Sequence, residues 1–168
     1  MFERSRITAL VAVGANLGHA RDTVREALVA LGRLPATRVE SISSLYRSAP
    51  YEAQGPDFIN AVARIATGLA APDLLAALQA LEAAAGRERP YLNAPRTLDL
   101  DLIFYGQACV DSPALTVPHP RWQARAFVLL PLAEVAPERV TPEMLAAVAG
   151  QVIERLEGPG RPERQVRT

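Results

Sequence analysis

Two aspartates at alternate positions are the residues of this sequence whose types and spacing most clearly suggest chemistry. Asp99 and Asp101 alternate with Leu98, Leu100 and Leu102. In a β-strand, alternate side chains share a face, so both carboxylates would lie together, with Cα atoms roughly 6.5 to 7 Å apart. The leucines would then face a core. Two neighbouring carboxylates resist simultaneous ionisation unless cations neutralise them, and hard oxygen ligands without thiolates or clustered histidines favour magnesium or manganese.

A basic segment comes directly before the two aspartates. It contains Arg87, Arg89 and Arg96, and guanidinium groups bind phosphate oxygens through paired hydrogen bonds. Arginines next to paired carboxylates are typical of phosphoryl transfer, where alignment and charge neutralisation do most of the work. Each feature alone has a plainer interpretation, because an Asp-x-Asp pair also occurs on solvent-facing strand edges and a basic loop can simply be solvated.

Hydrophobic periodicity predicts the elements that must hold these residues. We expect strands at 7–13, 37–48, 58–67 and 97–105, and helices at 20–34, 72–86, in the apolar stretch that runs through Leu132, and at 142–156. The order β-α-β-β-α-β with added C-terminal helices predicts an α+β fold, a sandwich of the ferredoxin-like type. A single domain is expected over residues 1–157, followed by a frayed tail over 158–168.

Bulk composition limits the classes of function. The chain has 168 residues, with 18 basic and 18 acidic side chains and no net charge, so we expect no nucleic-acid partner and no membrane partner. Its one cysteine, Cys109, excludes an internal disulfide and is expected to be a small buried residue in a reducing compartment. We therefore expect a cytoplasmic protein. A monomer is also expected.

The segment 94–103 resembles the signature of the 6-hydroxymethyl-7,8-dihydropterin pyrophosphokinases, enzymes of the folate pathway. The resemblance continues in the segments 13–18, 43–48, 57–60, 82–87, 115–119 and 125–127. Members of this family transfer the β,γ-pyrophosphoryl unit of ATP to the hydroxymethyl group of the reduced pterin and release AMP. The resemblance implies the same activity, with ATP as co-substrate.

The resemblance also implies roles for individual residues. Asp99 and Asp101 match magnesium ligands, and two ions are expected. The positions that match nucleotide-binding residues are Glu82, Arg87, Arg96, Leu102, His119 and Arg125. Arg87 and Arg96 are expected to be catalytic together with the two aspartates. The positions expected to bind the pterin are Ser48, Ala49, Phe58, Asn60 and Phe127. The two phenylalanines would sandwich the ring, while Asn60 supplies a donor and an acceptor to its edge.

Other interpretations stay open on the residues alone. A lone phenylalanine in an apolar segment, such as Phe58 or Phe127, more often belongs to the core. A regulatory domain of the same fold could bind a small ligand, an RNA-binding module would need more aromatics and a basic surface, and a metal nuclease would need further acidic ligands. The chain also departs from the family pattern at Asn93 and Pro120, where aromatic residues often occur.

Overall fold

The computed structural model describes residues 5–50, 55–86 and 98–158, which form a mixed α/β fold around an antiparallel sheet. The sheet has six strands in the order β5-β1-β4-β3-β8, and β2 also pairs with β4. These strands are β1 (Ile7–Ala15), β2 (Thr37–Ile42), β3 (Leu45–Ser48), β4 (Phe58–Thr67), β5 (Asp99–Tyr105) and β8 (Ile153–Glu157). A separate two-stranded ribbon consists of β6 (Val110–Asp111) and β7 (Thr116–Val117).

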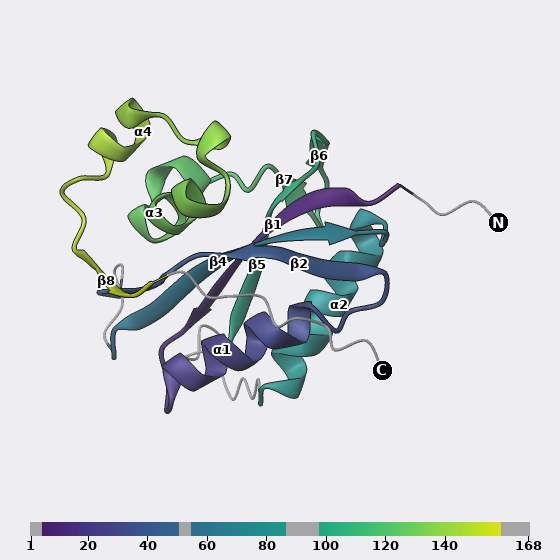
Figure 1. Cartoon of the computed structure of the whole chain (residues 1–168), viewed down its shortest axis with the longest axis horizontal. Helices are drawn as coiled ribbons and strands as arrows, with labels where there is room; N and C mark the ends of the chain where they lie inside the picture. The colour runs from purple at the N-terminus through teal and green to yellow at the C-terminus, as the bar shows by residue number, and fades with distance from the viewer. Residues whose placement is uncertain (1–4, 51–54, 87–97, 159–168) are drawn as a thin grey trace.

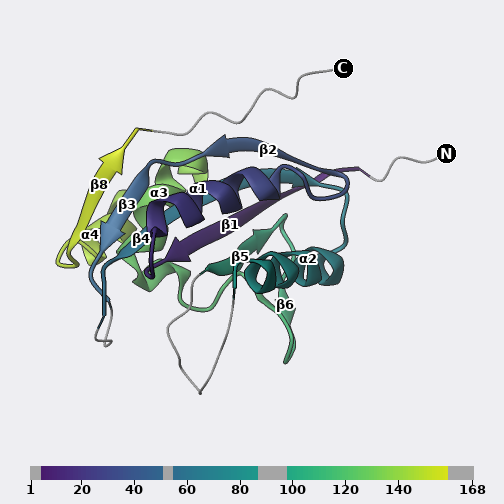
Figure 2. The same cartoon turned by 90° about the horizontal axis from the view of Figure 1, so that it is seen from below.

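Two helices cover one face of the sheet (Figure 2). They are α1 (Ala20–Leu31) and α2 (Ala71–Ala84). Val24 of α1 and Leu78 of α2 belong to the same buried cluster as Val11 and Val13 of β1. Helical spacing on the helices and alternation on the strand place these side chains on facing surfaces. Pro72 lies in the first turn of α2, as predicted, where a missing N–H costs little.

Helix α3 (Ala126–Val135) packs on the opposite face, where Val128 and Leu132 contact the cluster that includes Leu10 and Val62 (Figure 1). The short helix α4 (Pro142–Ala147) and the 3-10 turns η1 (Trp122–Ala124) and η2 (Pro137–Arg139) lie around α3. The two faces of the sheet are therefore covered by different helices, α1 and α2 on one face and α3 on the other.

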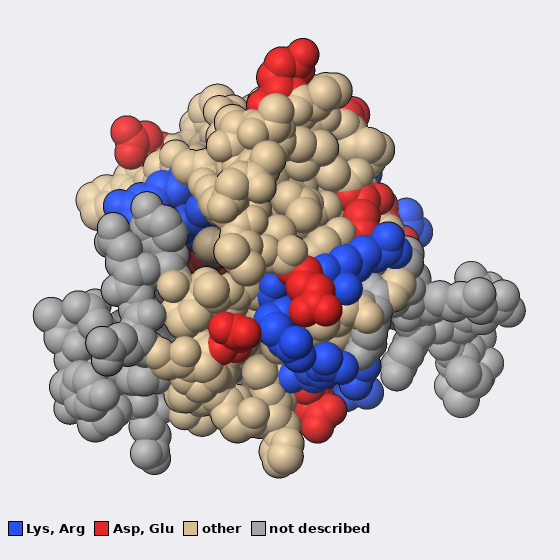
Figure 3. All heavy atoms as spheres, turned by 90° about the vertical axis from the view of Figure 1, so that its left-hand side faces the viewer, with Lys and Arg blue, Asp and Glu red and all other residues tan. Residues whose placement is uncertain are grey.

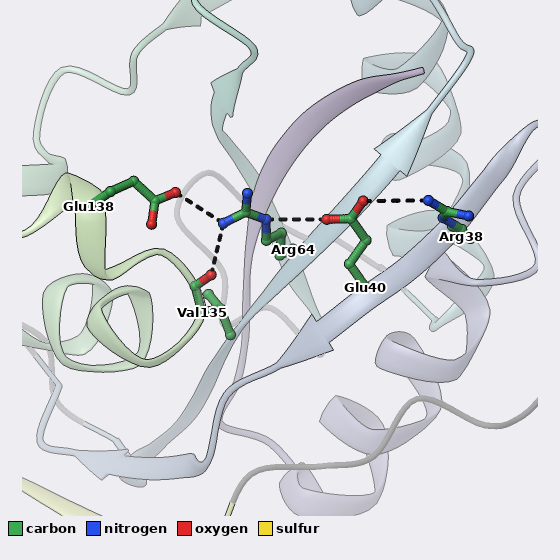
Figure 4. A network of polar contacts seen from close by, with 5 residues as sticks. All are labelled: Arg38, Glu40, Arg64, Val135 and Glu138. Atoms are coloured by element: carbon green, nitrogen blue, oxygen red, sulfur yellow. Dashed lines mark hydrogen bonds and ion pairs between the residues drawn. The ribbon is translucent and has the colours of Figure 1, made fainter. Parts of the chain in front are cut away.

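Arg64 of β4 fastens the end of α3 to the sheet (Figure 4). Its guanidinium donates to the carbonyl oxygen of Val135 at 3.2 Å and to Glu138 at 3.0 Å, while its Nε donates to Glu40 at 3.2 Å. Glu40 also lies 3.9 Å from Arg38. The partly exposed ion pairs each contribute little, but the bond to Val135 satisfies a carbonyl that the helix end leaves without a partner.

The helix predicted over 142–156 is wrong in its second half. Helix α4 ends at Ala147, and Ile153–Glu157 forms β8 beside β3. Gly150 lies between the two elements and weakens any continuing helix, while Val152 and Ile153 are β-branched residues that favour a strand. The edge of β3 provides backbone partners that local periodicity could not reveal.

The single strand predicted over 37–48 is two strands, β2 and β3. The hydroxyl of Ser43 accepts a hydrogen bond from the N–H of Val62 at 2.9 Å and donates to the carbonyl oxygen of Ser44 at 2.8 Å. A side chain thus takes a position in the ladder that a backbone carbonyl would otherwise hold, and the pairing breaks there.

Cys109 is exposed rather than buried. It lies between the end of β5 and the ribbon strand β6, where the chain has left the core. In the described ranges, no helix has the length and apolar character needed to cross a membrane.

Candidate functional site

A pocket of about 390 Å³ opens on the α3 face of the sheet. Its lining comes from four strands and from the segment that leads into α3: Ala12, Val13, Gly14, Ser48, Ala49, Phe58, Asn60, Asp99, Asp101, Arg121, Arg125 and Phe127. Both aspartates, Arg125 and all five residues expected to bind the pterin are therefore brought together. Ser48 and Phe127, which are 79 positions apart in the sequence, meet at this one place.

The register of the sheet explains why these residues meet. Gly14 of β1 pairs with Asn60 on one side and with Asp99 on the other. One row further along the same face, Ala12 pairs with Asp101. Because neighbouring strands lie about 4.8 Å apart, Asn60 and the aspartates flank a central strand whose residues have almost no side chain.

Gly14 gives the pocket its floor. A Cβ at this position would lie 3.3 Å from Oδ1 of Asn60 and 3.9 Å from the carbonyl oxygen of Ile59. A contact of 3.3 Å is tighter than ordinary van der Waals packing, so a side chain here would displace the Asn60 amide. The sequence pattern predicted that Gly14 ends the first strand, whereas β1 continues to Ala15 and Gly14 supplies space inside it.

Asn60 and Ser48 form a polar wall of the pocket. Nδ2 of Asn60 donates to Oγ of Ser48 at 2.8 Å, and both residues are buried. The Ser48 hydroxyl can still donate its own proton, and the carbonyl oxygen of Asn60 lies toward Gly14. The wall thus offers both a donor and an acceptor to a flat polar ligand.

Two half-buried phenylalanines stand next to this wall. Phe58 pairs with Ser48 across β3 and β4, and Phe127 lies in the first turn of α3. Neither ring is fully enclosed by protein, although both touch the pocket. This position differs from that of an ordinary core phenylalanine, and it leaves aromatic surface available for stacking on a planar ring.

Asp99 and Asp101 form the acidic part of the pocket. Both are half-buried on the α3 face, while Leu100 and Leu102 are buried on the other, which confirms the predicted alternation. Considering only the described ranges, no group of three or more acidic, histidine or cysteine side chains is placed to hold a metal ion. Magnesium commonly takes one or two carboxylates and completes its shell with phosphate oxygens and water, so two carboxylates in an open pocket fit that ion.

Arg121 and Arg125 form the basic part. The Arg125 guanidinium carbon lies 5.4 Å from the centre of the Phe127 ring, a cation–π contact that orients both side chains. Arg121 is exposed, and in the part of the chain that the structure describes neither arginine forms an ion pair. We did not predict Arg121 from the sequence. Its spacing, two residues after His119 and four before Arg125, was the available signal.

His119 lies beside the arginines without lining the pocket. Its Nδ1 accepts a hydrogen bond from the backbone N–H of Arg121 at 3.2 Å, so the neutral ring carries its proton on Nε2. Burial lowers the pKa of His119, the positive charges of Arg125 and Arg121 lower it further, and Asp99 acts in the opposite direction. The imidazole is therefore neutral near pH 7 and can donate through Nε2.

Besides His119, two described residues expected at the site, Leu102 and Glu82, do not line the pocket. Leu102 is buried on the α1 and α2 face, and Glu82 of α2 accepts a hydrogen bond from the N–H of Leu100 at 3.3 Å on that same side of β5. Arg87 and Arg96 lie outside the described residues, as do Arg89 and Asn93.

Comparison with known proteins identifies a family for this chain. A model of the 7,8-dihydro-6-hydroxymethylpterin-pyrophosphokinase family matches residues 10–137. A 2-amino-4-hydroxy-6-hydroxymethyldihydropteridine pyrophosphokinase of Pseudomonas aeruginosa is 49% identical over 155 residues, which cover 88% of this chain and 96% of that protein. A protein of the same name from Synechocystis sp. is 42% identical over 149 residues, which cover 89% of this chain and 76% of that protein.

Solved structures of low sequence identity share the fold. A crystal structure of HPPK-DHPS in complex with substrates matches with a TM-score of 0.59 and 13% identity, covering 79% of this chain and 40% of that one. A Plasmodium falciparum HPPK-DHPS triple mutant with STZ-DHP matches with a TM-score of 0.62 and 13% identity, covering 82% and 41%. The chain thus spans about two fifths of the length of these two structures.

Proposed function

Because the chain belongs to the 7,8-dihydro-6-hydroxymethylpterin-pyrophosphokinase family, we propose that the pocket on the α3 face is its active site. The protein is an ATP-dependent diphosphotransferase of folate biosynthesis. It transfers pyrophosphate from ATP to the hydroxymethyl group of 6-hydroxymethyl-7,8-dihydropterin. The observation that supports the location is that one pocket contains both a carboxylate pair with arginines and an amide with two phenylalanines.

The pterin half of the proposed site consists of Ser48, Asn60, Phe58 and Phe127, with Ala49 at the exposed rim. A pterin ring is flat and has a polar edge with both donors and acceptors. Asn60 and Ser48 would recognise that edge, and the phenylalanines would stack on the faces of the ring. A buried polar wall also gives specificity, because a ring without the matching edge would leave Asn60 without partners.

The phosphate half consists of Asp99, Asp101, Arg121 and Arg125, with His119 beside them. The two aspartates would hold magnesium, two ions in our proposal, which would neutralise phosphate charge and orient the phosphate chain. Arg121 and Arg125 would bind phosphate oxygens from the other side through charge-assisted hydrogen bonds. His119 would donate one further bond from Nε2. Arg87 and Arg96, outside the described residues, remain proposed phosphate ligands, and Glu82 and Leu102 remain proposed nucleotide contacts.

The transfer needs alignment more than proton chemistry. The hydroxymethyl oxygen forms a bond to the β-phosphorus of ATP, the bond from that phosphorus to the bridging oxygen of AMP breaks, and the alcohol proton passes to solvent. The Asn60 wall would fix the pterin while the arginines fix the phosphates, so that the two reacting atoms meet in line. Neutralisation of the phosphate charge by Arg121 and Arg125 would favour attack by an alcohol.

The finer description of the fold is likewise a proposal. We describe the segment from β1 to β5 as a ferredoxin-like β-α-β-β-α-β unit, which the antiparallel order β5-β1-β4-β3 supports. Residues 1–157 would form a single pyrophosphokinase domain. Strand β8 and helices α3 and α4 would then be additions to that unit.

The experiment that tests the location combines product analysis with one substitution. With ATP, magnesium and the reduced hydroxymethylpterin, the protein should form AMP and the pterin diphosphate in equal amounts, whereas ADP would contradict transfer of two phosphates. Asn60→Ala should weaken pterin binding at least about tenfold, because a buried hydrogen-bonding wall is lost, and should leave binding of a non-hydrolysable ATP analogue nearly unchanged. Unchanged pterin binding in Asn60→Ala would show that the pterin does not bind in this pocket.

A further inference from the structure

The C-terminal strand β8 lies beyond the part of the chain that the family model matches, which ends at residue 137. It nevertheless joins the sheet next to β3, the strand that carries Ser48 into the pocket (Figure 2). Figure 3 faces this side of the molecule and shows basic and acidic side chains next to one another rather than a patch of one sign. Specific polar contacts of β8, and not its overall charge, must therefore explain any effect on the site.

One row of cross-strand partners connects β8 to the pocket. Arg155 of β8 pairs with Tyr46 of β3, and Tyr46 pairs with Asn60 of β4. The row continues through Gly14 to Asp99. Paired residues on adjacent strands point to the same face, so the whole row belongs to the α3 face. Arg155 is two strand spacings from Asn60, or roughly 10 Å.

A polar cluster of Ser44, Tyr46, Glu134 and Arg155, here called the Glu134 cluster, fixes the β8 end of this row. Glu134 of α3 accepts hydrogen bonds from the backbone N–H of Ser44 at 3.2 Å, from the Ser44 hydroxyl at 2.7 Å and from the Tyr46 hydroxyl. Nε of Arg155 donates to the Ser44 hydroxyl oxygen at 2.9 Å. The cluster thus joins α3, the β3 segment and β8.

The phenol of Tyr46 remains a donor in this cluster. Burial raises the pKa of Tyr46 well above its ordinary value, and the hydrogen bond to Glu134 and its negative charge raise it further. Tyr46 is 5% exposed, so its hydroxyl depends on Glu134 for a partner. Removal of that carboxylate would leave a buried donor unsatisfied and would allow the side chain to move.

Two residues of the Glu134 cluster, Tyr46 and Glu134, lie close to residues of the pterin half of the pocket. Tyr46 is the cross-strand neighbour of Asn60, and the side chains of directly opposed residues stand about 5 Å apart. Glu134 lies seven residues after Phe127 on the same helix, about two turns or roughly 10 Å away. A shift of α3 against β3 would therefore change the separation of Phe127 from Phe58. No residue of the cluster lines the pocket itself.

We propose that Tyr46, Glu134 and Arg155 are positioning residues for the pterin. Strand β8 then contributes to pterin binding through Arg155. This inference rests on the proposed function of the pocket. Through β3 and α3, the cluster fixes the position of Asn60 relative to Phe127. Arg155 holds the Ser44 hydroxyl in place from the edge of the sheet. Its loss should weaken the binding of pterin more than that of the nucleotide.

The pair formed by Arg47 and Glu154 provides a matched control. It joins the same two strands, with Nη1 of Arg47 3.5 Å from Oε2 of Glu154, but alternation places it on the opposite face. Glu154→Gln therefore weakens the attachment of β8 without touching the Glu134 cluster. Arg155→Gln weakens the same attachment and also removes a cluster residue.

The test measures two dissociation constants for each variant, one for a non-hydrolysable ATP analogue with magnesium and one for the reduced pterin in the presence of that complex. The Kd of the pterin should rise about fivefold in Arg155→Gln and somewhat more in Glu134→Gln, because each loses a charge-assisted hydrogen bond within the cluster. The Kd of the analogue should stay within about twofold in both. Glu154→Gln should bind both ligands normally, and Arg155→Lys should recover part of the pterin affinity.

Three outcomes would overturn the inference. An equal loss of pterin affinity in Glu154→Gln and Arg155→Gln would mean that attachment of β8 alone matters. Normal pterin binding in Arg155→Gln and Glu134→Gln, with a loss in Asn60→Ala, would remove the positioning role and leave the proposed function intact. Normal binding in Asn60→Ala as well would overturn both. If a charge substitution unfolds the protein, Tyr46→Phe replaces it, since it removes a single hydroxyl, and normal pterin binding there would contradict the inference.

Discussion

The two faces of the central sheet are built from the same strands but from different kinds of residue. On the face under α1 and α2, Val11, Val13 and Leu100 are at most 5% exposed and pack in one apolar cluster. On the face under α3, the neighbouring positions include Gly14, which opens space for the pocket, and Asp99, which lines it. Strand alternation therefore places an apolar core on one face of the sheet and the pocket on the other.

This difference shows how a strand can hold carboxylates rigidly. Each buried leucine of β5 stabilises the fold by about 1.5 to 3 kcal/mol, which offsets the cost of placing two acidic side chains next to each other. The same leucines fix the backbone, so the aspartates have a defined direction before any ligand binds. The small residues of β1 complete the arrangement, because the core side of that strand is fully packed while its pocket side is left open.

The largest effects should come from alanine substitutions on β5, and they should differ between the two faces of that strand. Asp101→Ala or Asp99→Ala should lower the rate of AMP formation at least about 100-fold, because charge stabilisation in the transition state is lost. Leu100→Ala should instead lower the free energy of unfolding by about 2 to 5 kcal/mol and leave the kcat of the folded enzyme close to normal. Product assays and denaturant unfolding measure the two effects. A greater loss of kcat in Leu100→Ala than in Asp101→Ala would break the comparison between the faces.

A smaller effect is expected from filling the floor of the pocket. Gly14→Ala should weaken pterin binding roughly tenfold, because the new methyl group pushes on Oδ1 of Asn60. Gly150→Ala is the control, since a Cβ there meets nothing within 4 Å. Equilibrium binding of the reduced pterin measures both. Wild-type pterin affinity in Gly14→Ala would show that the space left by Gly14 is not needed for pterin binding.

The basic side of the α3 face can be tested with Arg121→Gln. The KM for ATP should rise about fivefold, because one charge-assisted hydrogen bond donated by an exposed guanidinium to a phosphate oxygen contributes about 1 kcal/mol. Arg33→Gln removes an exposed arginine that does not line this pocket and should have no effect. Steady-state kinetics at several salt concentrations distinguish a phosphate contact from a general charge effect, because equal changes in the two variants would indicate the latter.

The smallest effect concerns the Arg64 network at the end of α3, away from the pocket. A hydrogen bond from its own backbone N–H lowers the pKa of Glu138 below the ordinary value of 4.5, and the bond and charge of Arg64 lower it further. A lowered pKa in the folded state adds stability above the ordinary pKa and loses it as the pH falls through the folded pKa. Glu138→Gln should therefore cost less than about 1 kcal/mol at neutral pH, and the difference from wild type should vanish in acid. A loss of kcat in this variant would contradict its separation from the site.

Most of the residues that line the pocket could be predicted, because their placement depends on local patterns and on a specific resemblance. Alternation alone placed Asp99 and Asp101 on the face opposite the leucines, and the resemblance named Ser48, Asn60 and Phe127. What the sequence could not give depends on partners that are distant in the chain. The role of Gly14 requires the register with Asn60, and β8 forms only because β3 offers an edge.

The central claim is that pterin and phosphates share the pocket on the α3 face, and a crystal structure of the protein with magnesium, a non-hydrolysable ATP analogue and the reduced hydroxymethylpterin tests it most directly. The pterin should lie between Phe58 and Phe127 with its polar edge on Asn60, and the phosphate chain should lie next to Asp99 and Asp101. A pterin bound on the α1 and α2 side of the sheet, or a phosphate chain away from the two aspartates, would contradict the claim.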